Sequence, residues 1–263
     1  MGLVAREVNA LFAIASREIM RLVKSPGSLI ANMIFPIIFL GIMGGSLSQN
    51  LAGDVGYDFL QFVMIGMIVF NLYLGTASGI TSLVAERDMN LTQIFYVAPI
   101  SRYTIILGRM IGTSCGSLIS LIGVILVAVF MKIPFDGVQM LRLFLITPVF
   151  CLVGASLGML FIGFVQDVNV AQMGSMILVM PQMFFSGTII PISHSTGIIA
   201  FLAKLMPLTY LNDLARGIFY WKDSVYELVV LHHPLYNIVA LVIFFLVFSI
   251  VGTIMFTKSE QNK

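Results

Sequence analysis

"FLQFVMIGMIVFNLYLGTASGITSLVA", residues 59–85, contains no Asp, Glu, Lys or Arg. A helix needs about 20 apolar residues to cross the hydrocarbon core of a bilayer, which is roughly 30 Å thick. The run shows no strand-like alternation of polar and apolar side chains, and only helices or closed barrels satisfy their backbone groups in lipid. We therefore predict that this stretch is a membrane-spanning helix.

Runs of the same kind recur along the whole chain. The sequence is 59% hydrophobic and only 10% charged, with a mean hydropathy of +1.03, a composition typical of membrane proteins. The stretches without Asp, Glu, Lys or Arg are 25–53, 59–85, 110–131, 143–166, 168–203 and 234–257. We predict an all-α integral membrane protein that forms one transmembrane domain over residues 1–263. Its six predicted spans are 28–48, 59–83, 107–131, 143–165, 169–190 and 235–257.

The distribution of basic residues predicts the orientation. Six spans place both ends of the chain on one side of the membrane, and that side carries nine of the 14 lysines and arginines. These nine are Arg6, Arg17, Arg21, Lys24, Arg87, Arg102, Arg109, Lys258 and Lys263. Loops rich in Lys and Arg stay in the cytoplasm. We therefore expect both termini and residues 86–109 to be cytoplasmic.

The first 25 residues predict a helix that lies in the membrane interface. Apolar side chains recur at intervals of three and four and form one stripe along the helix. The basic residues Arg6, Arg17, Arg21 and Lys24 fall mostly on the opposite face. Such a helix lies on a membrane rather than crossing it. Its charges also interrupt any apolar core that a signal peptide would need.

Residues able to carry out chemistry are scarce. The three histidines, His194, His232 and His233, all fall in the predicted loop between the fifth and sixth spans. Both cysteines, Cys115 and Cys151, fall inside predicted spans. This pattern predicts neither a disulfide framework nor a metal site.

The sequence lacks the G-x-x-x-x-G-K-[ST] phosphate-binding loop, so the chain itself does not hydrolyse ATP in the manner of P-loop proteins. Its charge-free runs offer no acid or base near the bilayer midplane, where ion-coupled transporters place such groups. Energy for any work would come from another protein. Three further classes stay open at this point: an ATP-independent secondary transporter or facilitator, an intramembrane transferase and a passive membrane anchor.

A compact charged segment, "ERDMNLTQIFYVAPISR" at residues 86–102, separates the second and third predicted spans. It opens on three charges and continues with apolar side chains at helical spacing, until Pro99 ends the pattern. A short helix that is apolar on one face and charged at its ends suits insertion into a groove of a partner. The simpler interpretation is a solvated loop whose charges only fix the orientation.

This segment resembles a stretch typical of the membrane subunits of type-2 ABC exporters, E-R-E-x-G-T-L-E-x-L-L-V-[ST]-P-[IV]-S-R. The residues that match it are Glu86, Arg87, Asp88, Val97, Pro99, Ile100, Ser101 and Arg102. Asn90 replaces the usual Gly, and Leu91-Thr92 replaces the usual Thr-Leu.

A second stretch, "FFSGTIIPIS" at 184–193 followed by "LMPLTYLNDLARG" at 205–217, is similar to another pattern of the same family. That pattern is F-x-S-G-x-x-[FY]-P-[IL] followed by N-P-[LV]-T-Y-x-x-[DE]-x-[LA]-R. Met206 stands where Asn is common. Together the two stretches and the overall layout extend the resemblance over essentially the whole chain.

The resemblance implies a transport subunit that is not itself an enzyme. Two identical copies of the permease would pair, and each would dock a separate cytosolic ATPase that holds ATP and Mg²⁺. The chain itself would carry no cofactor and bind no nucleic acid. Residues 86–102 would form the coupling segment that contacts the ATPase, and residues 1–25 the interfacial elbow helix. The implied coupling residues are Glu86, Arg87, Asp88, Leu91, Ile94, Phe95, Pro99, Ser101 and Arg102.

The resemblance also implies a route for the substrate along the interface between the two permeases. Residues 191–217 would form re-entrant helices on the outer side, and spans two and five would line the path. The candidate path residues are Phe70, Asn71, Met180, Phe184 and Phe185. We expect an amphipathic or lipid-like substrate (a drug, lipid or glycan) and a location in the bacterial cytoplasmic membrane.

Overall fold

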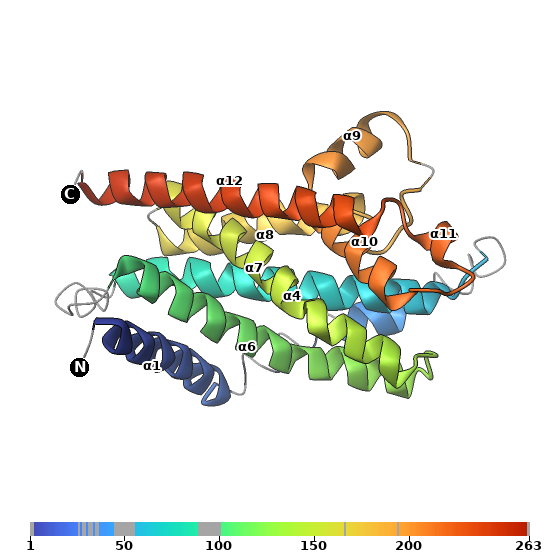
Figure 1. Ribbon diagram of the computed structural model, residues 1–263, viewed down its shortest axis with the longest axis horizontal. Helices are drawn as coiled ribbons and strands as arrows, with labels where there is room; N and C mark the ends of the chain where they lie inside the picture. The colour runs from blue at the N-terminus through green and yellow to red at the C-terminus, as the bar shows by residue number, and fades with distance from the viewer. Residues whose placement is uncertain are drawn as a thin grey trace.

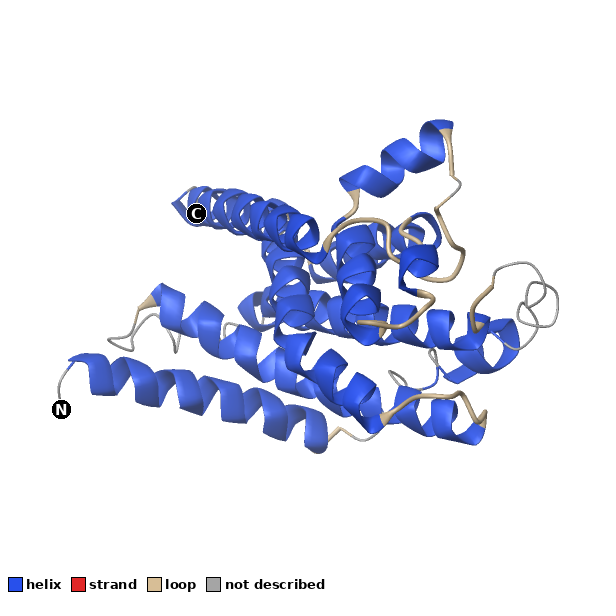
Figure 2. Cartoon of the chain, turned by 45° about the vertical axis from the view of Figure 1, so that its right-hand side comes forward, coloured by secondary structure: helices blue, strands red, loops and turns tan. Residues whose placement is uncertain are grey.

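The computed structural model describes residues 3–25, 27, 30, 34, 37–44, 56–88, 101–165, 167–193 and 195–261. Every regular element among these residues is a helix (Figures 1 and 2), as the sequence predicted. The elements are α1 (Leu3–Val23), the π-helix η1 (Phe39–Gly44), α4 (Phe59–Asp88), α6 (Arg102–Phe130), α7 (Gly137–Phe164), α8 (Val168–Phe185), α9 (Gly197–Leu205), α10 (Pro207–Phe219), α11 (Tyr226–Val229) and α12 (Pro234–Gln261).

Four helices are long and apolar enough to cross a membrane. Their apolar parts are Phe59–Val84, Leu107–Phe130, Gly137–Phe164 and Tyr226–Met255. They correspond to four of the six predicted spans. A fifth crossing is counted if α9 and α10, which meet at an angle of 83°, form one broken span. By length and composition the structure thus supports four or five crossings.

The other two predicted spans do not appear as long apolar helices among the described residues. Most of 28–48 lies outside the described residues, and η1 is its longest described piece. The span expected at 169–190 corresponds to α8, which ends at Phe185. The chain leaves the helix there because Gly187 adopts a left-handed conformation with φ of +76°. The apolar part of α8, Met176–Phe185, is shorter than a membrane crossing.

The long helices run along one axis of the molecule, and the two described ends of the chain lie at the same end of the bundle (Figure 1). α10 and α11 lie at the opposite end, where α9 projects from the body of the bundle. α4 occupies the centre, because it packs against α6, α7, α8 and α10. As a result, 83% of its apolar part is buried in the protein, against 11% for α12.

Glycines allow the central helices to approach closely. A Cβ atom at Gly154 of α7 would overlap the backbone of Tyr73 on α4, and one at Gly158 would lie 2.5 Å from the carbonyl oxygen of Ala77. Small residues at four-residue spacing are typical of helix contacts in membranes. Any larger side chain at Gly154 would force α4 and α7 apart.

Candidate functional site

α1 packs along the first turns of α6 and runs in the same direction (Figure 1). Near its start, the Glu7 carboxylate accepts hydrogen bonds from the backbone N–H of Ser101 at 3.1 Å and from the Thr104 hydroxyl. Further along, a Cβ at Gly112 of α6 would meet the Cβ of Glu18 at 2.6 Å, so only Gly permits this approach. α1 is therefore attached to α6 where α6 emerges from segment 86–102.

Glu7 supplies the cap for the start of α6. The first N–H groups of a helix have no partner within the helix, and a carboxylate there also interacts favourably with the helix dipole. The hydrogen bond from Thr104, followed by that from the Ser101 backbone, lowers the pKa of Glu7 below its ordinary value. An acidic residue of α1 thus holds the last residues of the predicted coupling segment.

We expect Glu7→Gln to remove an acid-sensitive part of the stability. Because the pKa of Glu7 is lowered in the folded protein, the carboxylate stabilises the fold above the ordinary value of 4.5, and that contribution is lost as the pH falls through the lower folded pKa. Thermal unfolding of the purified chain from about pH 6 down to about pH 3 measures this. The exposed Glu227→Gln on α11 is the control. Parallel loss of stability in the wild type and in Glu7→Gln would contradict the assignment.

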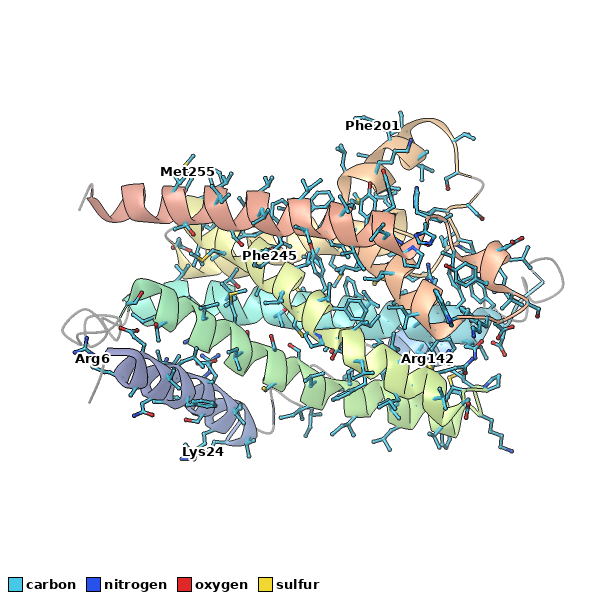
Figure 3. All side chains as sticks on the ribbon, in the orientation of Figure 1. Arg6, Lys24, Arg142, Phe201, Phe245 and Met255 are labelled. Atoms are coloured by element: carbon cyan, nitrogen blue, oxygen red, sulfur yellow. The ribbon has the colours of Figure 1, made fainter. Side chains whose placement is uncertain are left out.

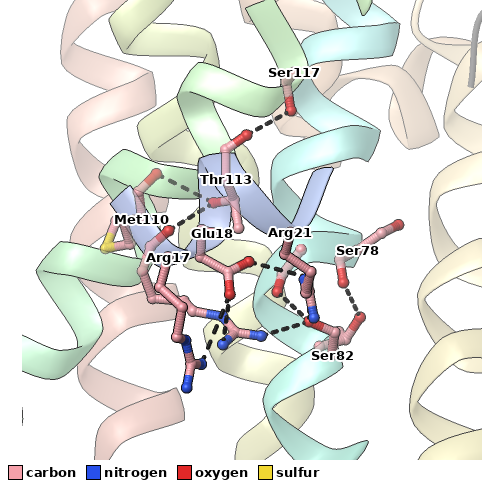
Figure 4. A network of polar contacts seen from close by, with 11 residues as sticks. Arg17, Glu18, Arg21, Ser78, Ser82, Met110, Thr113 and Ser117 are labelled. Atoms are coloured by element: carbon pink, nitrogen blue, oxygen red, sulfur yellow. Dashed lines mark hydrogen bonds and ion pairs between the residues drawn. The ribbon is translucent and has the colours of Figure 1, made fainter. Parts of the chain in front are cut away.

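A second attachment is a cluster of charges around the buried Glu18, which we call the α1–α6 charge cluster: Glu18 with Arg17, Arg21 and Arg109. Figure 4 shows Glu18 beside Arg17 and Arg21. Glu18 Oε1 lies 3.0 Å from Arg109 Nη1, and Glu18 Oε2 lies 3.0 Å from Arg21 Nη2. Arg17 is more distant, at 3.8 Å. The side chains of Glu18 and Arg109 are 0% and 1% exposed, so this ion pair is shielded from water.

The cluster also reaches α4 through Ser82. Arg109 Nη2 donates to the Ser82 hydroxyl at 2.7 Å, and Arg21 Nη2 donates to it at 3.4 Å. Burying charges costs free energy, and the close pairing with Glu18 together with the bonds to Ser82 offsets part of that cost. The cluster therefore joins α1 to both α4 and α6, the two helices that flank segment 86–102.

The predicted coupling residues fall partly within the described chain. Glu86, Arg87 and Asp88 form the last turn of α4, while Ser101 precedes α6 and Arg102 begins it. The other predicted residues, Leu91, Ile94, Phe95 and Pro99, lie outside the described residues. The described residues therefore include both ends of segment 86–102 but not its middle.

The predicted elbow residues lie on or directly after α1, and the residues that sequence reasoning missed lie on α1 and α6. Arg6 and Lys24 are exposed, and the side chains of Arg17 and Arg21 are 44% and 46% exposed. Glu7, Glu18 and Arg109 were not predicted as site residues. One pattern would have found Glu18: it is an isolated acid that directly follows Arg17 and precedes Arg21 by three residues.

The candidate path residues differ in their surroundings. Phe70 of α4 is 1% exposed and belongs to the core of the chain, and Asn71 and Met180 are half-buried. Phe184 of α8 is 47% exposed, and Phe185 is half-buried. Of this group, Phe184 is the side chain that lies most fully at the surface.

A second polar cluster occupies the opposite end of the bundle and is centred on α10. The guanidinium of Arg216 lies 3.4 Å from the ring centroid of Phe62 on α4 and donates to the carbonyl of Gly187 at 2.7 Å. One turn earlier, the Asn212 amide donates to the Thr188 hydroxyl at 2.8 Å. These contacts hold the segment after α8 between α10 and α4.

Asp213 joins α10 to the beginning of α12. Its carboxylate accepts from the backbone N–H of Leu231 at 2.6 Å, the backbone N–H of His232 at 2.8 Å and the side-chain amide of Asn237 at 2.8 Å. Asp213 is 2% exposed. One carboxylate thus satisfies three donors where the chain turns into α12.

Two further side chains of the same stretch fix the bend between α9 and α10. The Thr209 hydroxyl donates to the carbonyl of Ala203 at 2.7 Å, and the Tyr210 hydroxyl donates to the carbonyl of Lys204 at 2.9 Å. The last carbonyls of a helix have no partner within it, so these bonds cap α9. Each polar residue of the second motif between Thr209 and Arg216 therefore has a structural contact.

Comparison with known proteins agrees with this arrangement of a multi-pass helical bundle. The family model of ABC-2 type transporters matches residues 9–220, and the chain belongs to that family. A protein of Cyanophora paradoxa described as the transport permease ycf38 is 24% identical over 266 residues, which cover 95% of this chain and 89% of the relative. The proteins of the same description from Porphyra purpurea and Pyropia yezoensis are 24% and 22% identical, each over 81% of this chain and 74% of the relative. The chain is therefore the membrane permease component of an ABC transporter, a transport subunit without a catalytic site of its own, and such permeases generally pair with ATPase subunits.

Proposed function

We propose that this permease belongs to an exporter that moves an amphipathic or lipid-like substrate out of the cytoplasm or its inner leaflet. A separate ATPase, docked on residues 86–102, would supply the energy, and two copies of the permease would assemble with two ATPases. The chain would cross the bacterial cytoplasmic membrane six times, with both termini in the cytoplasm. The observation that carries the proposal is the attachment of α1, α4 and α6 to one another at both ends of segment 86–102.

The attachment suggests how a movement of the segment would reach the membrane. Glu7 holds Ser101, and Arg109 joins α6 to Glu18 of α1 and Ser82 of α4. A displacement of the segment by the ATPase would therefore move the end of α4 together with the starts of α1 and α6. ATP would favour one permease state because the closed ATPase pair binds that state more tightly, and hydrolysis would remove the preference.

We expect Glu86→Ala and Arg102→Ala to weaken docking of the ATPase by about 10-fold or more without unfolding the chain, because each change removes a charged contact worth about 1.5–3 kcal/mol. Recovery of a P-loop ATPase with the tagged chain, followed by substrate-stimulated ATP turnover, measures the effect. Glu227→Ala on α11 and Lys204→Ala on α9 are matched controls, because they remove the same charges from exposed positions at the other end of the bundle.

Two results would contradict the proposal. Normal ATPase recovery and normal stimulated turnover in both variants would exclude residues 86–102 as the docking element. A folded chain that recovers no P-loop ATPase and moves its substrate down a gradient without ATP would instead be a facilitator.

A further inference from the structure

The charged residues of α1 are sorted by sign. Both of its acidic residues point toward the protein: Glu7 binds the start of α6, and Glu18 pairs with Arg109. The basic residues Arg6, Arg17, Arg21 and Lys24 keep much of their side chains at the surface. Figure 3 shows Arg6 and Lys24 at the two ends of α1. The outer surface of α1 is therefore cationic.

The same surface also carries an apolar row. Val8, Phe12, Met20 and Val23 are between 45% and 67% exposed, although α1 is firmly attached through Glu18. Exposed apolar residues beside exposed basic residues are typical of helices that bury one face in a bilayer and bind its headgroups with the other. A water-filled surface would accommodate the charges but not the apolar row.

The position of α1 agrees with a membrane surface. The apolar part of α6 begins at Leu107. α1 contacts α6 from Ser101, which precedes this boundary, to Gly112, which follows it. In a bilayer that covers the apolar part of α6, α1 would therefore lie where the hydrocarbon region meets the headgroups.

We propose that α1 binds anionic phospholipid headgroups, with Arg6 and Lys24 as principal contacts and Arg17 and Arg21 between them. Charge complementarity selects an anionic lipid, because no acidic side chain of α1 is directed to the outer surface. The Glu18–Arg109 pair fixes the rotation of α1 about its own axis, so the apolar and basic rows meet the membrane together. Such binding would not depend on the substrate or on the direction of transport.

The test uses the full-length chain purified in a neutral detergent. Thermal unfolding is followed while phosphatidylglycerol or phosphatidylcholine is added to the micelles, at low and at high salt. The double variant Arg6→Gln/Lys24→Gln is compared with Lys132→Gln/Lys204→Gln, which removes the same charge from exposed positions elsewhere. Each basic residue near an anionic membrane surface contributes about 1 kcal/mol, so each charge removed should raise the half-saturating amount of phosphatidylglycerol about fivefold.

We expect phosphatidylglycerol to stabilise the wild type more than phosphatidylcholine does. This extra stabilisation should be smaller in the α1 variant but not in the control variant, and high salt should suppress it in the wild type. If the variant folds poorly, the salt dependence of phosphatidylglycerol stabilisation in the wild type still tests the proposal. Equal responses of both variants to phosphatidylglycerol would overturn the proposal. So would an α1 variant that keeps its lipid response but no longer recovers the ATPase, because the basic row would then face that protein.

Discussion

Replacing Glu18 with Gln is expected to destabilise the folded chain by about 3–5 kcal/mol, the usual cost of removing one partner from a buried ion pair. The change removes the carboxylate that lies 3.0 Å from Arg109 while the guanidinium stays buried. Unfolding of the purified chain by heat or by denaturing detergent measures the effect. The companion variant Arg17→Gln should cost less than about 1 kcal/mol, because Arg17 is 44% exposed and 3.8 Å from the same carboxylate.

A double variant separates pairing from packing at this position. Glu18→Leu combined with Arg109→Met removes both charges, and such replacements are often neutral or even stabilising. It should therefore be more stable than Glu18→Gln alone. If Glu18→Gln costs no more than Arg17→Gln, the α1–α6 charge cluster does not hold α1 in place.

Asp213→Ala is expected to cost a similar amount, about 3–5 kcal/mol, at the other end of the bundle. It leaves the partly buried N–H groups of Leu231 and His232 and the buried amide of Asn237 without their acceptor, and an unsatisfied buried donor costs about 1–3 kcal/mol. Amide hydrogen exchange should show faster exchange over residues 230–237, because the start of α12 would lose its attachment to α10.

Asp223→Ala is the control for this variant. Asp223 is exposed and lies between α10 and α11, and its bonds to Ser224 and Val225 are local and longer, at 3.3 and 3.4 Å. Its replacement should change stability by less than about 1 kcal/mol. Unchanged exchange over residues 230–237 in Asp213→Ala would show that α10 does not secure α12.

The sequence predicted the long helices well because backbone N–H and C=O groups find no hydrogen-bond partners in lipid. A run without charges has to satisfy its backbone internally, so 59–83 and 143–165 become α4 and α7 with small differences at the ends. Hydropathy does not show where a helix stops inside an apolar run. Pro181 lies within α8 rather than ending it, and the positive φ of Gly187 turns the chain after Phe185.

The contacts of α1 could not be derived from its periodicity. An amphipathic pattern indicates that a helix has two faces, but not which helix one of them meets. Arg109 was counted among the charges of a cytoplasmic loop, whereas α6 begins at Arg102 and carries Arg109 two turns inward to Glu18. The pairing depends on contacts between three separate helices. The sequence alone does not show which helices lie close together.

The unequal burial of α4 and α12 has a consequence for how this family diverges. Almost every position of α4 touches another helix, so a change of side-chain size there has to be matched by a change elsewhere. α12 faces outward along most of its length, and one apolar residue there serves nearly as well as another. Neutral substitutions should therefore accumulate fast along α12 and slowly along α4. Sequence alignments of distant relatives should then depend on the central helix α4 rather than on α12, although α12 is the most uniformly apolar helix.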